Sequence, residues 1–190
     1  EELPRGHLRI VDRIKDIYKN NRGQTIAPRK VESRFEGAPG IKRTFLAGDG
    51  RAYNTLLIVP DRDEPFLDSL SESEVEEYFH RLVTQANLDL APYERVVGFA
   101  LLDRDFSLEE GELTPKGSYR RKAIAENFAA VLEELYRSNR RTLEWNGTQV
   151  VIPRWVFRDL GVLEDAIGTD AEGLVNRRTD RRLRLGRGQQ

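Results

Sequence analysis

The sequence contains no cysteine and no methionine, and its only histidines are His7 and His80. Without cysteine the chain can form neither disulfide bonds nor thiolate metal sites. Two histidines that lie far apart in the sequence also argue against a histidine-based metal centre. Because no methionine stands before the polar start EELPRG, we expect the chain to be cut from a longer protein.

An excess of charge of one sign is missing too. The 190 residues include 31 basic and 32 acidic side chains, which gives a formal net charge of -1. This balance gives no reason to expect bulk binding to nucleic acids or anionic membranes. Membrane-spanning apolar runs and a signal-peptide pattern are also missing, so the sequence predicts a cytoplasmic location. The shares of apolar residues, 38%, and of charged residues, 33%, predict one core of moderate size under a dense polar shell.

Hydrophobic alternation and turn residues define the first predicted elements. Strands are predicted over residues 7–13 and 15–28, and the turn NNRG interrupts the second of them. Gly23 in this turn suits a positive φ angle. Pro28 stands where the first turn of a short helix favours proline.

The next elements reach residue 137 and complete a compact pattern. They are strands over 41–50 and 52–61, a helix over 71–90, a strand over 96–106 and a helix over 118–137. The apolar run LLIV indicates a strand that is covered on both faces, and Ser71 or Ser73 fits the N-cap of the first long helix. The order of elements predicts an α+β fold, a small sheet with helices packed against it.

The pattern changes after residue 137. Residues 138–175 are predicted to form an extension, with a β-hairpin that turns at Asn146 and Gly147 and a short helix after Pro153. The basic tail, residues 176–190, contains six arginines and little to bury, so we expect it to be disordered or a linker. Contact of this tail with nucleic acid is the alternative, which the lack of interleaved aromatic residues disfavours.

Four segments resemble one known family and occur in the order typical of it. They are GHLRIVDRIKDIYKNNRGQTIAPRKVE, IKRTFLAGDGRAYNTLLIVPD, QANLDLAPYERVVGFALLDRDFSLEEGELTP and RRKAIAENFAAVLEELY. Together they resemble the small C-terminal lid domain of acyl-adenylate-forming enzymes, and most of all the long-chain fatty-acid CoA ligase branch of AMP-forming acyl-CoA synthetases. The resemblance covers residues 6–137.

The resemblance implies a mobile domain that closes first over ATP and the acyl-adenylate and then over CoA. The whole enzyme would use ATP with Mg2+, a fatty or similar carboxylic acid and CoA. The partner would be the missing N-terminal adenylation domain of the same chain, so this domain alone should be inactive. Two alternatives stay open: a lid of an acyl-adenylating enzyme that loads a carrier protein, and a non-catalytic regulatory homologue.

The resemblance also implies roles for single residues. Arg13 falls at the nucleotide-binding arginine and Lys15 at the hinge, where a solvated residue can absorb large changes of φ and ψ. Gly23 falls in the loop that lines the CoA channel. Arg120 and Arg121 stand at the start of a helix, where the macrodipole does not favour cations. They are candidates for contact with a phosphate of CoA, and the alternative is an ordinary solvated helix face.

The catalytic lysine of the family poses a problem of register. When the LTP and RRK anchors are aligned without gaps, this lysine falls on Ser118, and Lys116 lies two positions earlier, across Gly117. Either Lys116 acts as the catalytic lysine from a shifted loop, or the adenylation step is lost or altered. Pro28 and Glu32 also match the family motif, and we interpret them as structural, a helix start and a surface carboxylate.

Overall fold

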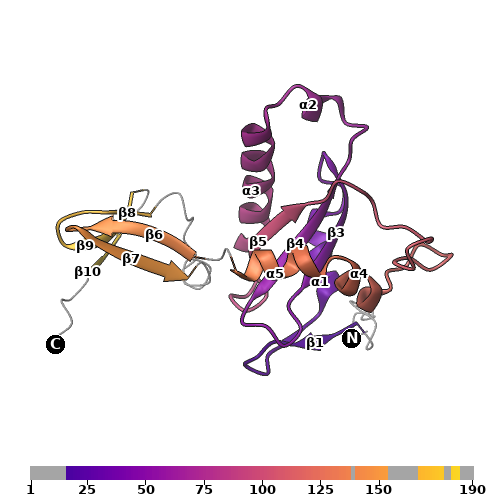
Figure 1. The fold of residues 1–190 in the computed structure, drawn as a ribbon, viewed down its shortest axis with the longest axis horizontal. Coiled ribbons are helices and arrows are strands. Elements are labelled where there is room, and N and C mark those ends of the chain that lie inside the picture. The colour runs from indigo at the N-terminus through magenta and orange to yellow at the C-terminus, as the bar shows by residue number, and fades with distance from the viewer. Residues whose placement is uncertain (1–15, 138–139, 154–166, 178–180, 185–190) are drawn as a thin grey trace, which may run out of the picture.

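The computed structural model describes residues 16–137, 140–153, 167–177 and 181–184. Figure 1 shows the arrangement of the elements along the chain. The predicted strand over 7–13, the candidate residues Arg13 and Lys15, and the helix predicted after Pro153 lie outside the described residues.

The first elements that the structure describes are a short hairpin and a short helix, as the sequence predicts for this part of the chain. Strands β1 (Tyr18–Lys19) and β2 (Thr25–Ile26) pair antiparallel on either side of the NNRG turn. Helix α1 (Pro28–Glu32) starts with its proline in the first turn, and a 3-10 turn (Ser33–Phe35) continues it. Proline is preorganised for this position because its φ angle is already helical.

A three-stranded sheet forms the centre of the domain. Strand β4 (Asn54–Pro60) lies between β3 (Ile41–Ala47), to which it is antiparallel, and β5 (Val96–Leu101), to which it is parallel. A parallel pair needs a crossover connection. Here α2 (Pro65–Asp68) and α3 (Glu72–Leu88) supply it.

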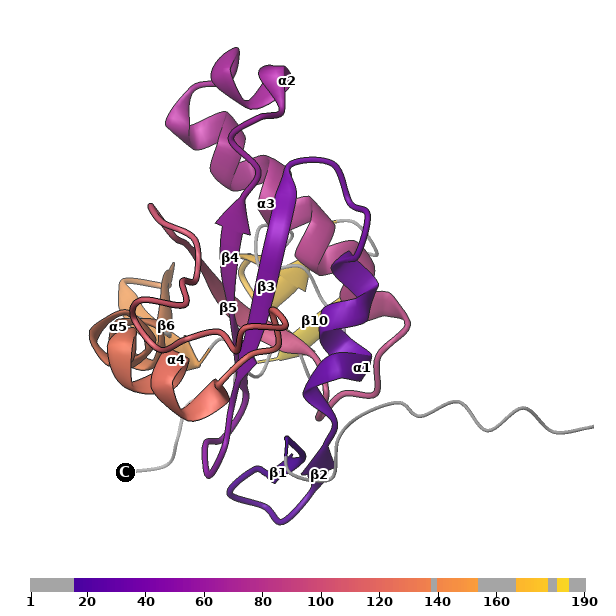
Figure 2. The same ribbon diagram turned by 90° about the vertical axis from the view of Figure 1, so that its right-hand side faces the viewer.

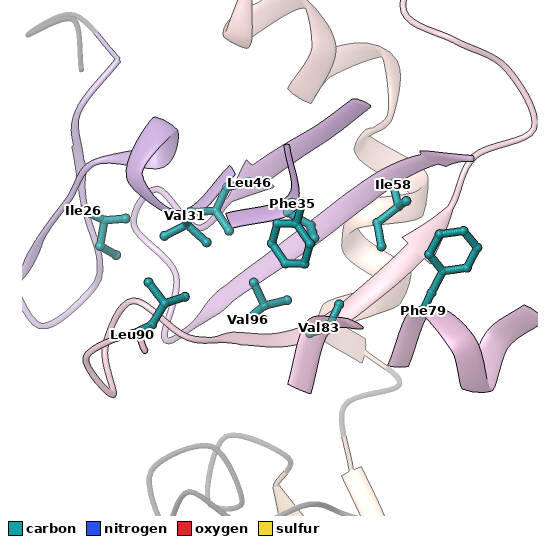
Figure 3. Packing of buried hydrophobic residues seen from close by; sticks show 10 residues of the cluster. Ile26, Val31, Phe35, Leu46, Ile58, Phe79, Val83, Leu90 and Val96 are labelled. Atoms are coloured by element: carbon teal, nitrogen blue, oxygen red, sulfur yellow. The ribbon is translucent and has the colours of Figure 1, made fainter. Parts of the chain in front are cut away.

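Helices cover both faces of this sheet, as Figure 2 shows. Successive strand residues point to opposite faces, so the run LLIV in β4 contributes to two cores, and the prediction of a strand covered on both faces is confirmed. The core beside α1 and α3, drawn in Figure 3, consists of Ile26, Val31, Phe35, Leu46, Leu56, Ile58, Phe79, Val83, Leu90 and Val96. The core beside α4 (Arg121–Asn127) and α5 (Ala129–Arg137) consists of Phe45, Leu57, Val59, Leu102, Phe106, Leu113, Ile124, Phe128 and Leu132.

The boundaries of two predicted elements are wrong. The helix predicted over 118–137 begins only at Arg121, because residues 118–120 are extended and Tyr119 forms a β-bridge with Leu113. It is also divided at Phe128 into α4 and α5. The strand predicted over 96–106 ends at Leu101. The start of α3 is as predicted. Ser71 is the N-cap, and the backbone N–H of Ser71 donates a hydrogen bond to the Glu74 carboxylate at 2.8 Å.

The residues after 139 form further strands beside the larger domain (Figure 1). Strands β6 (Arg140–Trp145) and β7 (Thr148–Pro153) make the predicted hairpin, with Asn146 and Gly147 at φ angles of 49° and 74°. Strands β8 (Ile167–Thr169), β9 (Gly173–Asn176) and β10 (Arg181–Arg184) form a sheet in the order β10-β9-β8. A small core of their own holds Ile152, Ile167, Leu143, Val150 and Leu174.

The prediction of a disordered basic tail is wrong for β10, which pairs antiparallel with β9. Two ion pairs explain why arginines can lie here: Arg182 is 3.6 Å from Asp170, and Arg184 is 3.4 Å from Glu172. The division of the chain into residues 1–137, 138–175 and 176–190 stays a prediction. Among the described helices, none has the length and apolar character that crossing a bilayer requires.

Candidate functional site

Lys116 lies at the tip of a tight hairpin, here called the Lys116 hairpin (residues 113–119). The backbone N–H of Thr114 donates to the carbonyl of Ser118 at 2.8 Å, and the N–H of Gly117 donates to the carbonyl of Thr114 at 2.8 Å. Gly117 has a φ angle of 76°. This is the three-residue loop in which a turn with proline in second place is followed by a left-handed glycine. The sequence TPKGS therefore fixes Lys116 at the apex.

The tip of the hairpin is open, whereas one leg faces a cleft. The Lys116 side chain is exposed, and its Nζ forms no hydrogen bond or ion pair with any residue that the structure describes. Ser118 lines a cleft of about 500 Å3 between the hairpin, α1 and β3. The structure thus brings both candidates for the lysine position into one hairpin, and the catalytic role of Lys116 stays a prediction.

Glu112 anchors the base of the hairpin and is 0% exposed. Its carboxylate accepts hydrogen bonds from Arg104 at 2.6 and 2.8 Å, from the backbone N–H of Ser107 at 2.9 Å and from Nδ2 of Asn127 at 3.0 Å. Its carbonyl accepts the N–H of Arg120 at 2.7 Å, which joins the two legs. The hydrogen bonds from Arg104, supported by those from Asn127 and Ser107, lower the pKa of Glu112 to about 2, although burial opposes this shift.

A second ion pair lies just after the second leg of the hairpin, where the chain enters α4. Arg121 donates to the Glu32 carboxylate at 2.7 and 3.2 Å and to the Leu46 carbonyl at 2.7 Å, and the Leu46 N–H donates to Glu32 at 2.8 Å. The interpretation of Glu32 as a surface carboxylate is wrong. It is only 7% exposed, because α1 packs on β3 and turns its last residue toward the strand. The guanidinium of Arg121 also lies 4.5 Å from the centre of the Phe45 ring.

These contacts bear on the predicted contact between a CoA phosphate and the basic helix start. The anion that faces Arg121 is the domain's own Glu32, and the Arg121 side chain is only 15% exposed. Arg120 is exposed, and Lys122, 91% exposed, pairs with Glu126 one turn along at 3.7 Å. The geometry therefore gives Arg121 a structural function. A role of Arg120 or Arg121 in the CoA channel stays a prediction.

The NNRGQ loop closes a second hairpin, here called the Gly23 hairpin (residues 18–26). The Gly23 N–H donates to the Asn20 carbonyl at 3.0 Å, and the Asn20 N–H donates to the Gln24 carbonyl at 3.1 Å. Asn20 Oδ1 accepts the N–H groups of Arg22 and Gln24, both at 3.0 Å. Gly23 has a φ angle of 77°, and a Cβ added there would meet no described atom within 4 Å beyond the adjoining residues. The positive φ angle that the turn requires explains why glycine stands at position 23. A role of Gly23 in a CoA channel stays a prediction.

Further contacts fix the Gly23 hairpin on the sheet. The Tyr18 hydroxyl donates to Asn54 Oδ1 at 2.8 Å, and burial raises the pKa of Tyr18 well above its ordinary value. Gly48 fits closely beside them, because a Cβ there would clash with Asn54 Oδ1. A second cleft, of about 630 Å3, opens between this region and α4–α5, with Arg121 in the wall that it shares with the first cleft.

Sequence reasoning missed Glu112 and Asn20. No local pattern separates Glu112 from Glu109 and Glu110 in the same acidic run, so its burial could not be read from the sequence. Asn20, by contrast, stands at the first position of a turn that ends in glycine, where asparagine side chains often accept backbone N–H groups. Within the described ranges, no cluster of three or more histidine, aspartate or glutamate residues could hold a metal ion.

Comparison with known proteins identifies the family. A family model described as AMP-binding enzyme C-terminal domain matches residues 15–140. The chain belongs to this family. Long-chain-fatty-acid–CoA ligase 1 of Cavia porcellus is 30% identical over 149 residues, which are 70% of this chain and 21% of the ligase. Long-chain-fatty-acid–CoA ligase FadD15 of Mycobacterium tuberculosis is 29% identical over 145 residues, 69% of this chain and 24% of the ligase.

Solved structures agree with this assignment. The adenylation domain of a carboxylate reductase from Mycobacterium chelonae is 26% identical with a TM-score of 0.59, over 67% of this chain and 20% of that one. The A-PCP didomain of a carboxylic acid reductase from Segniliparus rugosus, in complex with AMP, has a TM-score of 0.56 at 24% identity, over 67% and 18% of the two chains. The AMP-binding C-terminal family and the α+β fold that the sequence predicts are confirmed. The chain spans about a quarter of the length of its curated relatives.

Proposed function

We propose that this domain is the mobile lid of an AMP-forming, long-chain-type acyl-CoA synthetase. It would close over ATP and the acyl-adenylate and then over CoA, and its partner would be an N-terminal adenylation domain. The observation that carries the proposal is the Lys116 hairpin: it projects a cation that pairs with none of the described residues, from a base that Glu112 anchors. Membership in the AMP-binding C-terminal family supports it.

The proposed chemistry of Lys116 is electrostatic. In the adenylation step, a carboxylate oxygen of the acid attacks the α-phosphorus of ATP, and the bond to pyrophosphate breaks. A lysine ammonium near the carboxylate and the α-phosphate would stabilise the negative charge that develops there, above all once the closed lid excludes water. Lysine suits this function because its point charge sits on a long, flexible stem.

The other components would lie outside this domain. The phosphates of ATP and the N-terminal domain would hold Mg2+, because this ion is usually bound by substrate phosphates with one or two carboxylates. The fatty or similar carboxylic acid would bind in the N-terminal domain as well. We therefore expect the 190-residue chain alone to form no acyl-CoA.

The test is ATP–pyrophosphate exchange by the longer enzyme that contains this domain. Lys116→Ala should lower the exchange rate by about 10²-fold, the usual effect of losing one group that stabilises developing charge. Arg81→Ala is the matched control, because Arg81 is an exposed cation on α3 that pairs with Glu77 one turn away. Exchange that is unchanged in Lys116→Ala would remove Lys116 from the site and favour the non-catalytic, regulatory alternative.

A second candidate function changes only the acceptor of the acyl group. The likeness to the adenylation domain of a carboxylate reductase, and to an A-PCP didomain of a carboxylic acid reductase, supports as the alternative an enzyme that passes the acyl group to a carrier-protein thiol. The strands after residue 139 would then belong to a further module. Offering the acyl-adenylate either CoA or a carrier protein with its pantetheine arm separates the two functions, and thioester formation with CoA is the result that our first proposal expects.

A further inference from the structure

We propose that Glu112 is a positioning residue for Lys116: its buried carboxylate, held by Arg104, sets where the tip of the Lys116 hairpin lies. This inference deepens the function proposed above and, for its consequence on activity, rests on it. Its structural part can be tested without any activity, so the two can fail separately.

The carboxylate of Glu112 joins the base of the Lys116 hairpin to two other parts of the domain. Arg104 and Ser107 belong to the loop after β5, and Asn127 belongs to α4. Each carboxylate oxygen accepts two hydrogen bonds, Oε1 from Arg104 and Asn127 and Oε2 from Arg104 and Ser107. The guanidinium of Arg104 also lies 4.6 Å from the centre of the Phe128 ring, at the junction of α4 and α5. The anchor is thus fixed from several directions.

The hairpin extends from this anchor to an exposed tip. Leu113 and Tyr119 form the bridge next to Glu112, and the Tyr119 ring packs against those of Phe45 and Phe106. Beyond the bridge, residues 115–117 are exposed. The position of Lys116 therefore depends on the orientation of the two legs.

A small rotation at the base moves the tip appreciably. Lys116 lies four residues beyond Glu112, or at most roughly 13 Å along the chain at the rise of a β-strand. A rotation of about 10° would displace the tip by about 2 Å. Because misplacement by about 1 Å can lower a rate by about 10²-fold, the anchor decides whether the ammonium reaches the developing charge.

Glu94 offers a matched control. It is also a buried carboxylate, 4% exposed, and it accepts hydrogen bonds from Lys30 Nζ at 2.6 and 2.7 Å. It lies between α3 and β5, beside the core on the opposite face of the sheet, and does not touch the Lys116 hairpin. Glu94→Gln therefore makes the same chemical change to a buried ion pair elsewhere.

The structural test is amide hydrogen exchange of the 190-residue chain, measured by NMR. In Glu112→Gln, the Gly117 and Thr114 amides, which close the loop, should exchange about tenfold faster relative to the Leu57 amide of the central strand. In Glu94→Gln the ratio should be unchanged. If the hairpin amides change only in step with the Leu57 amide in both variants, Glu112 is merely stabilising and the proposal is overturned.

The functional test uses ATP–pyrophosphate exchange by the longer enzyme. Glu112→Gln should lower kcat about tenfold with little change in the KM for ATP, whereas Glu94→Gln should not. The double variant Glu112→Gln with Lys116→Ala should be no slower than Lys116→Ala alone, because Glu112 acts through Lys116. Additive losses would overturn the positioning role. If Lys116→Ala alone has no effect while the hairpin amides still respond to Glu112→Gln, the anchor stands and the proposed function of Lys116 fails.

Discussion

The Gly23 hairpin and the Lys116 hairpin contain the same three-residue loop, but the domain holds them at different points. In the Gly23 hairpin, the Asn20 side chain binds the loop itself, and the backbone of Asn21 and Lys19 is tied to the turn between β3 and β4 at 3.0 and 2.9 Å. In the Lys116 hairpin, Thr114 Oγ1 likewise accepts the N–H of Ser118 at 3.1 Å, but a buried ion pair binds the base and the tip is exposed. A loop that is fixed along its length is suited to lining a binding site. A loop that is fixed only at its base is suited to placing an exposed side chain against a ligand.

Removing Arg104 should have the largest effect on the base of the Lys116 hairpin. Arg104→Ala leaves the Glu112 carboxylate buried without its charged partner, so we expect a loss of about 3 kcal/mol in the free energy of unfolding, measured in urea. Arg51→Ala is a close control, because both arginines are 44% exposed and both lie 4.6 Å from an aromatic ring centre. The partner of Arg51, Glu133, is half exposed, so this loss should stay below about 1 kcal/mol. Equal losses of unfolding free energy in the two variants would mean that the burial of Glu112 adds nothing to the stability that its ion pair provides.

Acid should weaken the same anchor. The folded pKa of Glu112, about 2, is below the ordinary value of 4.5, so between these values the unfolded chain binds more protons than the folded one. The contribution of Glu112 is therefore fully present above about pH 5 and is lost as pH falls toward 2, with a total of about 3 kcal/mol. Wild type and Glu112→Gln should converge in stability over this range. A difference in unfolding free energy that stays constant from pH 5 to pH 2 would contradict the lowered pKa.

The stability of the Gly23 hairpin should depend on the neutral side chain of Asn20. Asn20→Ala removes the acceptor of two backbone N–H groups, and we expect a loss of about 2 kcal/mol in unfolding free energy. Asn21→Ala, at an exposed position whose backbone bond is kept, should change stability by less than about 0.5 kcal/mol. Thermal unfolding of both variants checks this, and a similar shift for the two would argue against the Asn20 side chain as the anchor.

Substitution of the two loop glycines should have the smallest effect on stability, and the effect should be the same in both hairpins. Gly23 and Gly117 have φ angles of 77° and 76°, and a Cβ added at either would meet no described atom within 4 Å beyond the adjoining residues. Alanine at either position should therefore cost only the backbone strain, about 1 kcal/mol, and the two costs should agree. Unequal unfolding free energies for Gly23→Ala and Gly117→Ala would mean that the two loops are not built alike.

Local patterns predicted the parts of the fold that local chemistry decides. The run LLIV indicated a strand between two cores, Ser71 indicated the start of α3, and Asn146 with Gly147 indicated a hairpin turn; the structure confirms all three. In each case the signal and its consequence lie within a few residues of one another.

The predictions were wrong where contacts between residues far apart in the sequence decide the local structure. Residues 118–120 have a helical pattern, but pairing of Tyr119 with Leu113 keeps them extended. Glu32 is the last residue of the short helix α1, and its partner in the interior is Arg121, 89 positions later in the sequence. The arginines of β10 lacked visible partners until the strand was placed beside Asp170 and Glu172. The site shows the same limit, because TPKGS fixes the loop locally while its anchor depends on Arg104 and Asn127.

The most direct test of the account is an experimental structure of the longer enzyme with a non-hydrolysable acyl-adenylate analogue. We expect the Lys116 hairpin to keep its loop and its Glu112 anchor, and Lys116 Nζ to lie within hydrogen-bond distance, about 3 Å, of the acyl or phosphate oxygens. A closed complex in which Lys116 points into solvent and another residue contacts those oxygens would contradict it.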